Sequence, residues 1–251
     1  MHSLAPAPPI LWPVQPVWQL DPAHPIPESE RRTCCAVATT LMMLNHFLPA
    51  QGVPRSFLHV RNGLLRAGGK NSQGHWQHSA QVAFFATFGL VAWRRNWAAP
   101  SQNPQWLADH EGYSPAQLAA LRDQTASESP LSAAERPWSC LRRSLASIGP
   151  VIASVMPGFT TNRQNHQIVL LGFRSDGPST VLAFLDPLAH PRLHPFESDL
   201  PRFLAHFNRR AIFVLPPDAS DRSPESHTCD SETPPGTPRT FPAVPEFLSS
   251  T

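Results

Sequence analysis

The chain has 251 residues and lacks any apolar run that could cross a membrane. A spanning helix needs about 20 consecutive, predominantly apolar residues, and no stretch approaches that length. The first ten residues also lack the basic segment and unbroken apolar core of a secretory signal. We therefore expect no membrane span and a cytoplasmic location, with secretion by a non-classical route as the open alternative.

Clusters of positive charge are also missing. Twenty Lys and Arg residues face 18 Asp and Glu, which gives a formal net charge of +2 without blocks of one sign. Lys70 is the only lysine, a bias typical of a GC-rich, bacterial genome. Because phosphate binding needs clustered basic side chains, we expect no nucleic-acid partner.

Cysteine is scarce, and its spacing is not that of a metal site. The four cysteines are Cys34, Cys35, Cys140 and Cys229. No Cys-x-x-Cys occurs, and a vicinal pair makes a poor disulfide, so reduced thiols are expected.

Two histidine pairs have spacings that resemble those of metal ligands. They are His75 with His78 and His190 with His194, but Pro191 interrupts the second pair. Neither pair has an obvious third ligand, and zinc needs three or four convergent groups. We expect no metal and no cofactor.

Proline is abundant, and it gathers at the two ends. Of 30 prolines, eight fall in residues 1–27 and eight in residues 216–251. We expect an extended arm outside the core over 1–32, a domain over 1–217 and a disordered Pro/Ser/Thr-rich tail over 218–251. Residues 98–137 are polar and broken by prolines, which predicts an insertion or lid with a short helix at 115–122.

The remaining patterns place helices first and strands second. Apolar residues at helical spacing predict a helix that begins near Thr33, then helices over 54–67, 75–88 and 138–148. Short apolar runs predict strands over 151–156, 167–173, 181–185 and 211–215. This order predicts the α+β class.

Three residues suggest nucleophilic catalysis. Cys35 opens the first predicted helix, where a thiol becomes acidic, and it could instead be a small buried apolar residue. His166 begins a predicted strand, and Asp186 closes the next one. If those strands pair, the carboxylate lies beside the histidine and can orient it as a base. A nucleophile, a base and an acid in this order predict a triad.

These motifs resemble those of the peptidase C39-like branch of the papain-like cysteine peptidases. The resemblance covers about residues 13–217, apart from 98–137. The matching segments are Gln19-Leu-Asp21, Cys35 with Thr39, Met42 and Leu44, Ser72 to Leu90, His166 to Phe173, and Asp186-Pro187. It implies a papain-like fold in which N-terminal helices pack on a C-terminal antiparallel sheet.

The resemblance also implies a role for each site residue. Cys35 would be the nucleophile, His166 the general base, Asp186 the orienting acid and Gln19 the side-chain oxyanion donor. Gln15 could replace Gln19, because the gap before the cysteine is long. Helical register favours Cys35 over its neighbour Cys34 as the nucleophile.

We therefore expect a cysteine peptidase that cleaves a peptide or amide bond through an acyl-enzyme. The partner would be a peptide or protein substrate. Two alternatives remain open: an acyltransferase on the same triad, and a catalytically inactive peptide-binding module.

Overall fold

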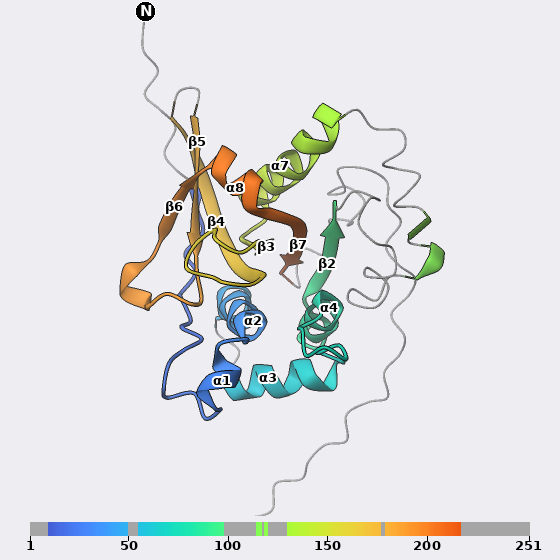
Figure 1. Cartoon of the computed structure of the whole chain (residues 1–251), viewed down its shortest axis with the longest axis vertical. Coiled ribbons are helices and arrows are strands. Elements are labelled where there is room, and N and C mark those ends of the chain that lie inside the picture. Colours follow the sequence, from blue (N-terminus) through green and yellow to red (C-terminus); the bar gives the residue numbers. More distant parts are fainter. Residues whose placement is uncertain are drawn as a thin grey trace, which may run out of the picture.

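The computed structural model describes residues 10–49, 55–97, 114–116, 118–119, 130–176 and 179–216. Within these residues the chain forms helices first and most of its strands afterwards (Figure 1). The helices are α1 (Glu28–Arg31), α2 (Cys35–Phe47), α3 (Phe57–Arg66), α4 (His78–Ala86), α7 (Pro130–Ser147) and α8 (Leu200–His206), and Pro191–Leu193 form a 3-10 turn. The strands are β1 (Ile10–Leu11), β2 (Val91–Asn96), β3 (Val151–Val155), β4 (His166–Asp176), β5 (Ser179–Leu185), β6 (Phe196–Asp199) and β7 (Phe207–Leu215).

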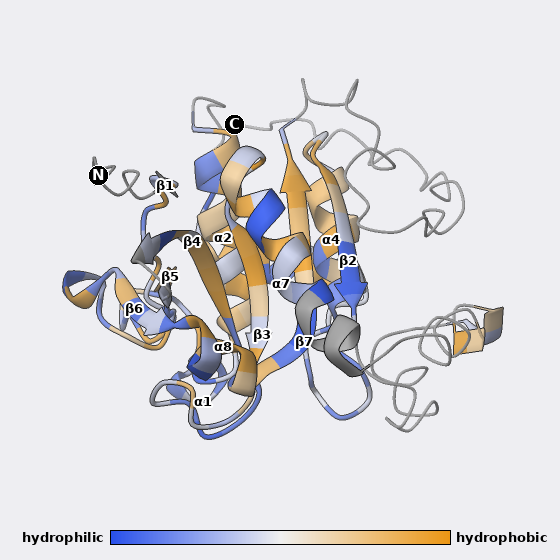
Figure 2. Ribbon diagram, turned by 90° about the horizontal axis from the view of Figure 1, so that it is seen from above, coloured by the Kyte–Doolittle hydropathy of each residue, from blue (hydrophilic) through white to orange (hydrophobic). Residues whose placement is uncertain are grey.

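The strands form one antiparallel sheet in the order β2-β7-β3-β4-β5-β6, and β1 pairs with β4 outside this path. A buried cluster on one face joins the sheet to α2, α3 and α4. A second cluster on the other face contains residues of α7 and α8. Figure 2 shows α2 and the inner strands largely in the hydrophobic colours. The expected α+β class, with N-terminal helices packed on a C-terminal antiparallel sheet, is confirmed.

Local sequence explains where the helices begin. The Ser56 side chain accepts a hydrogen bond from the His59 amide and starts α3. The Asp199 side chain does the same for Arg202 at the start of α8, which has Pro201 in its first turn. Neither α1 nor α8 was predicted.

The expectation that the N-terminal arm lies outside the core is wrong for its described part. Val14 and Ile26 are buried in the cluster beneath α2. β1 pairs with β4, and the Trp12 indole donates to the Leu145 carbonyl at 2.8 Å. Proline favours extended backbone but does not prevent apolar side chains between the prolines from being buried.

The expectations for residues 98–148 are met in part, and some of them fall outside the described residues. The helix expected at 138–148 begins earlier, at Pro130, and continues through Pro137. Residues 115–116 and 118–119 are helical, in agreement with the short helix expected at 115–122. Residues 130–137, expected to belong to the insertion, form the first part of α7 instead. Residues 98–113, 117 and 120–129 lie outside the described residues, as does the tail expected over 218–251.

Candidate active site

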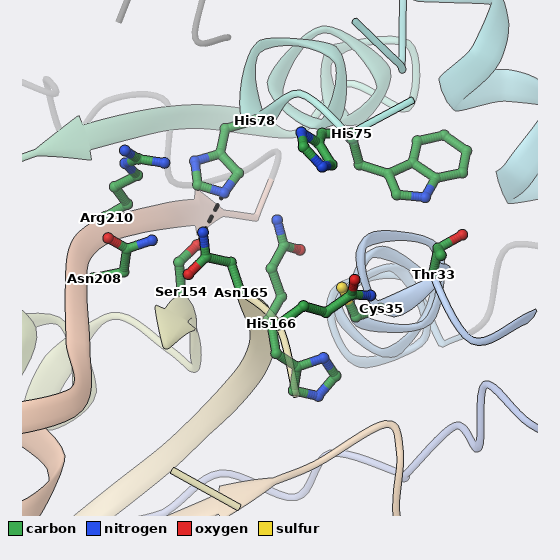
Figure 3. A pocket seen from close by; sticks show the side chains of 12 residues that line it. Thr33, Cys35, His75, His78, Ser154, Asn165, His166, Asn208 and Arg210 are labelled. Atoms are coloured by element: carbon green, nitrogen blue, oxygen red, sulfur yellow. Dashed lines mark hydrogen bonds between the residues drawn. The ribbon is translucent and has the colours of Figure 1, made fainter. Parts of the chain in front are cut away.

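Cys35 is the first residue of α2, and its side chain lines a cleft at the end of the sheet (Figure 3). The residue is partly exposed. The first N–H groups of a helix lack acceptors within the helix and carry a partial positive charge. The Cys35 thiolate receives a backbone hydrogen bond from Ala36 in this turn and another from Gln167 on β4. The site is therefore arranged to hold a negative sulfur.

His166 begins β4 as predicted, and its ring lies between Cys35 and Asp186. Its Nε2 atom donates to Asp186 Oδ1 at 2.7 Å. The same ring is the side-chain hydrogen-bonding partner of the Cys35 thiol. With Nε2 occupied by the carboxylate, Nδ1 is the nitrogen that faces the sulfur. The structure thus brings the three residues together as an ordered series.

Asp186 follows β5 directly, and β5 pairs with β4, which places the carboxylate next to His166. Asp186 is only 1% exposed. Its Oδ1 also accepts from the Leu188 amide at 2.8 Å, and its Oδ2 accepts from the Thr160 hydroxyl at 2.6 Å. These contacts hold the carboxylate ionised and fixed toward the imidazole.

Electrostatics favour the charged forms of all three residues. Burial by itself raises the pKa of the Cys35 thiol, but the hydrogen bond from His166, its charge and two backbone amides outweigh burial and lower the pKa. Burial acts to lower the pKa of His166, yet Asp186 and Cys35 together raise it to about 9. The pKa of Asp186 is lowered because contacts with His166 and Thr160 outweigh burial. These shifts all act in the direction that favours a thiolate beside an imidazolium.

Thr160 was not anticipated from the sequence. It lies in a turn stabilised by Asn162, whose side chain accepts from the Thr160 amide at 3.1 Å. The Asn162 amide group in turn donates to the carbonyls of Met156 and Gln164, at 3.0 and 2.8 Å. A Thr-x-Asn turn between the third and fourth strands was the available signal, but it does not by itself indicate a carboxylate partner.

A network of buried amides lies beneath the cysteine. Gln81 on α4 and Gln167 on β4 pair through both amide groups, at 2.9 and 3.1 Å. The Thr39 hydroxyl of α2 donates to the same Gln167 oxygen at 3.0 Å. Gln81 also donates to the Thr40 hydroxyl and to the Ala36 carbonyl. This network joins α2, α4 and β4 directly behind the sulfur and was not predicted.

Cys34 occupies a different environment from its neighbour. It is 0% exposed and belongs to the apolar cluster beneath α2. Burial, with a contribution from the negative charge of Glu30, raises the pKa of Cys34 to about 12. Its thiol is therefore neutral and lies away from the cleft.

The two candidate oxyanion donors also differ in position. Gln19 is 0% exposed, and its backbone N–H donates to the carbonyl of Pro187, the residue after Asp186. Its Nε2 donates to the Arg31 carbonyl at 2.9 Å, just before the cysteine. Gln15 is exposed and lines a separate cavity beside Asn45 and His46, at the other end of α2. Gln19 is therefore the glutamine next to the triad, although its side chain is not among those that line the cleft.

The histidine pairs have other contacts. His78 Nε2 shares a hydrogen bond with the Ser154 hydroxyl at 3.0 Å (Figure 3). His190 caps the 3-10 turn through Arg192 and lies against Trp18. Within the described ranges, no group of three or more His, Cys, Asp or Glu could hold a metal ion. No helix there has the length and apolar character needed to span a membrane.

No protein-family model and no curated protein matches the chain. Among solved structures, it is similar to the peptidase domain of Streptococcus ComA, a bi-functional ABC transporter involved in a quorum-sensing pathway. The two share 17% identity over 81% of this chain and 99% of that one, with a TM-score of 0.43.

A second similar structure is a double glycine motif protease from an AMS/PCAT transporter in complex with the leader peptide. It is 15% identical over 82% of this chain and 94% of that one, with a TM-score of 0.42. The peptidase domain of Streptococcus mutans ComA is 16% identical over 80% and 99% of the two chains, with a TM-score of 0.36. All three are peptidase domains of transporters.

Proposed function

We propose that the chain is a cysteine peptidase of the papain-like, C39-like type, which cleaves a peptide or amide bond through an acyl-enzyme. One observation carries this proposal: the Cys35 thiol, the His166 ring and the Asp186 carboxylate form a continuous hydrogen-bonded series at the wall of a cleft. A structural cysteine needs neither a lowered pKa nor an oriented imidazole beside it.

The reaction begins from the thiolate–imidazolium pair. The Cys35 sulfur attacks the substrate carbonyl carbon, and the carbonyl oxygen becomes an oxyanion. The Cys35 amide N–H, which starts α2, stabilises this oxygen. Gln19 adds its second Nε2–H if its buried side chain turns toward the cleft when substrate binds. His166 then protonates the leaving amine, and the carbon–nitrogen bond breaks to give a thioester.

Water completes the cycle. His166, now neutral, accepts a proton from a water molecule that attacks the thioester. The acid product leaves, and Cys35 returns to the thiolate. Asp186 stays ionised throughout. It holds the ring so that Nδ1 can first protonate the leaving amine and then take the proton from water.

The test is turnover of a defined peptide mixture, followed by mass spectrometry. We expect the wild-type chain to cleave peptides and Cys35→Ser to lower kcat/KM by about a thousandfold or more. Cys34→Ser is the matched control, and it should keep most of the activity because Cys34 lies in the core rather than in the cleft. Equal cleavage by wild type and Cys35→Ser would contradict the proposal, as would a loss caused only by Cys34→Ser.

The same assay separates hydrolysis from acyl transfer. In the presence of a primary amine, a hydrolase releases mainly the acid, whereas an acyltransferase forms mainly the new amide. The partial exposure of Cys35 and the polar lining of its cleft favour access of water and hence the acid product.

A further inference from the structure

The segment between β3 and β4, residues 156–165, touches the site at two places. Its last two residues, Gln164 and Asn165, line the cleft (Figure 3). Thr160, in its middle, donates its hydroxyl to Asp186 Oδ2 at 2.6 Å. The bonds that Cys35 makes and breaks do not involve this hydroxyl, so its contact with the carboxylate has a different role.

The segment is fixed by its own hydrogen bonds. Asn162 is 4% exposed, and its side chain accepts from the Thr160 amide and donates to two backbone carbonyls of the segment. The Gly158 amide donates to the Asn162 carbonyl at 3.0 Å, which closes the turn. Thr160 is therefore held in place from within the segment, independently of its contact with Asp186.

The core also anchors this segment. Phe159, next to Thr160, is 2% exposed and belongs to the cluster that contains residues of α7 and α8. The centroid of its ring lies 5.2 Å from that of Phe184 on β5. Arg202 of α8 donates to the Phe159 carbonyl at 3.1 Å. Because Phe184 is two residues before Asp186, the same packing sets the hydroxyl and the carboxylate relative to each other.

The Thr160 hydroxyl has one hydrogen, and the distances assign it to Asp186. The carboxylate oxygen lies at 2.6 Å, whereas the Asn162 side-chain oxygen lies at 3.4 Å, near the limit of a hydrogen bond. Asp186 Oδ1 accepts from His166 and from the Leu188 amide. With Thr160 on Oδ2, donors hold both oxygens and fix the plane of the carboxylate. Asp186 is 1% exposed, so solvent does not replace a donor that is lost.

We infer that Thr160 is a positioning residue of the triad: its hydroxyl orients the Asp186 carboxylate so that Oδ1 meets the His166 ring. The inference rests on the proposed function, because it extends the hydrogen-bonded series of that site from three residues to four. Thr160 is not among the described residues that line the cleft, so it acts through Asp186. Without the hydroxyl, the buried Oδ2 lacks its donor, the carboxylate turns, and the imidazolium that stabilises the thiolate is less favoured.

Two histidines respond to the charge of Asp186. Burial acts to lower the pKa of His166, but contacts with Asp186 and Cys35 raise it to about 9. The pKa of His194 is lowered, because burial outweighs the attraction of the carboxylate. A change in the orientation of Asp186 should therefore register at His166, and through it in the pH at which Cys35 becomes a thiolate.

The test is the rate of Cys35 alkylation by iodoacetamide from pH 4 to pH 8, followed residue by residue with mass spectrometry. Thr160→Val keeps the shape of the side chain and removes the hydroxyl. We expect its rate at pH 6 to be about fivefold lower than in the wild type and its midpoint to lie at higher pH. Only part of the stabilisation that a hydrogen bond gives a charged acceptor reaches the thiol, which limits the effect to this size.

Three further variants at this turn control for packing. Thr160→Ala also lacks the hydroxyl and should behave like Thr160→Val. Thr160→Ser keeps the hydroxyl and should restore most of the rate and of the midpoint. Thr161→Val changes the exposed threonine next in the chain and should match the wild type. Urea denaturation verifies that each variant is folded under the conditions of the assay.

The variant Asp186→Ala distinguishes positioning from general damage. In that background Thr160→Val should cause no further slowing, because the hydroxyl acts through the carboxylate. A wild-type midpoint in folded Thr160→Val and Thr160→Ala would overturn the inference, as would the same slowing in the Asp186→Ala background. Failure of the proposed function gives a different result: Cys35 would then react no faster in the wild type than in His166→Ala.

Discussion

At the scale of single residues, the site depends on opposite pKa shifts in two neighbours. The pKa of Cys35 is lowered, and that of His166 is raised to about 9, mainly through contacts with each other and with Asp186. Because each charge stabilises the other, the two groups titrate as a pair. The reactive form has the thiol deprotonated and the ring protonated.

This pairing predicts a bell-shaped pH dependence of kcat/KM for peptide cleavage. On the acid side, kcat/KM should increase with pH, and the midpoint of this increase should lie below the ordinary thiol pKa of about 8.5, because the pKa of Cys35 is lowered. On the basic side it should fall with a midpoint near 9, where His166 loses its proton. In Asp186→Asn the basic midpoint should move to lower pH, because the carboxylate raises the pKa of His166. A single rise near 8.5 with no basic fall would contradict the ion pair.

Cys35, His166 and Asp186 could be selected from the sequence because each stands at the end of a predicted element. The structure brings them together for that reason: β4 and β5 pair and bring His166 and Asp186 to one edge. Thr160 and Gln81 could not be identified as site residues from the sequence. Their contacts depend on a turn and on helix packing that leave no periodic pattern in the sequence.

At the scale of elements, the position of α2 against the sheet is fixed by buried amides. Gln81 and Gln167 satisfy each other, and the backbone N–H of Gln167 reaches the Cys35 sulfur. The same strand therefore carries His166 and a donor to the thiolate. Loss of one amide would leave the other buried without its partner.

We expect Gln81→Leu to lower the free energy of unfolding by about 1–3 kcal/mol, measured by urea denaturation. Alkylation of Cys35 should slow in the same variant, because β4 loses its anchor on α4. The double variant Gln81→Leu with Gln167→Leu should recover part of the stability, since no polar group of the amide pair then remains unsatisfied. If the double variant is less stable than the sum of the single changes, the amide pair does not act as described.

Three strands, β1, β2 and β6, were not predicted from the sequence, and each has a physical reason. β2 carries Arg94 and Arg95 within a six-residue edge strand, so it lacks a continuous apolar run. β6 has four residues, of which Ser198 alone is buried, and β1 has only two. Edge strands bury little and leave a weak pattern, whereas the inner strands β3 and β5 were found.

At the scale of the whole molecule, the N-terminal arm is part of the domain. Its described residues add a strand to β4, bury Val14 and Ile26, and link Gln19 to the segment after Asp186. Arg31, at the end of α1, donates to the His24 and Ile26 carbonyls and so holds the arm against the turn before Cys35. Stability and site geometry are therefore coupled through this arm.

A chain that begins at Glu28 should be destabilised by about 3 kcal/mol or more, because it loses two buried aliphatic side chains. Guanidinium denaturation measures this loss, and Cys35 alkylation should slow in parallel. A chain that begins at Ile10 retains every described contact of the arm and is the control. Unchanged stability of the shorter chain would show that the arm does not belong to the core.

In the proposed mechanism, His166 activates Cys35. The most direct measurement is the rate of iodoacetamide alkylation of Cys35 at pH 6, followed residue by residue with mass spectrometry, in the wild type and in His166→Ala. We predict that the wild-type thiol reacts about a hundredfold faster, because only the wild type holds a thiolate at a pH well below the ordinary thiol pKa of about 8.5. Equal rates in the two proteins would show that His166 does not activate Cys35.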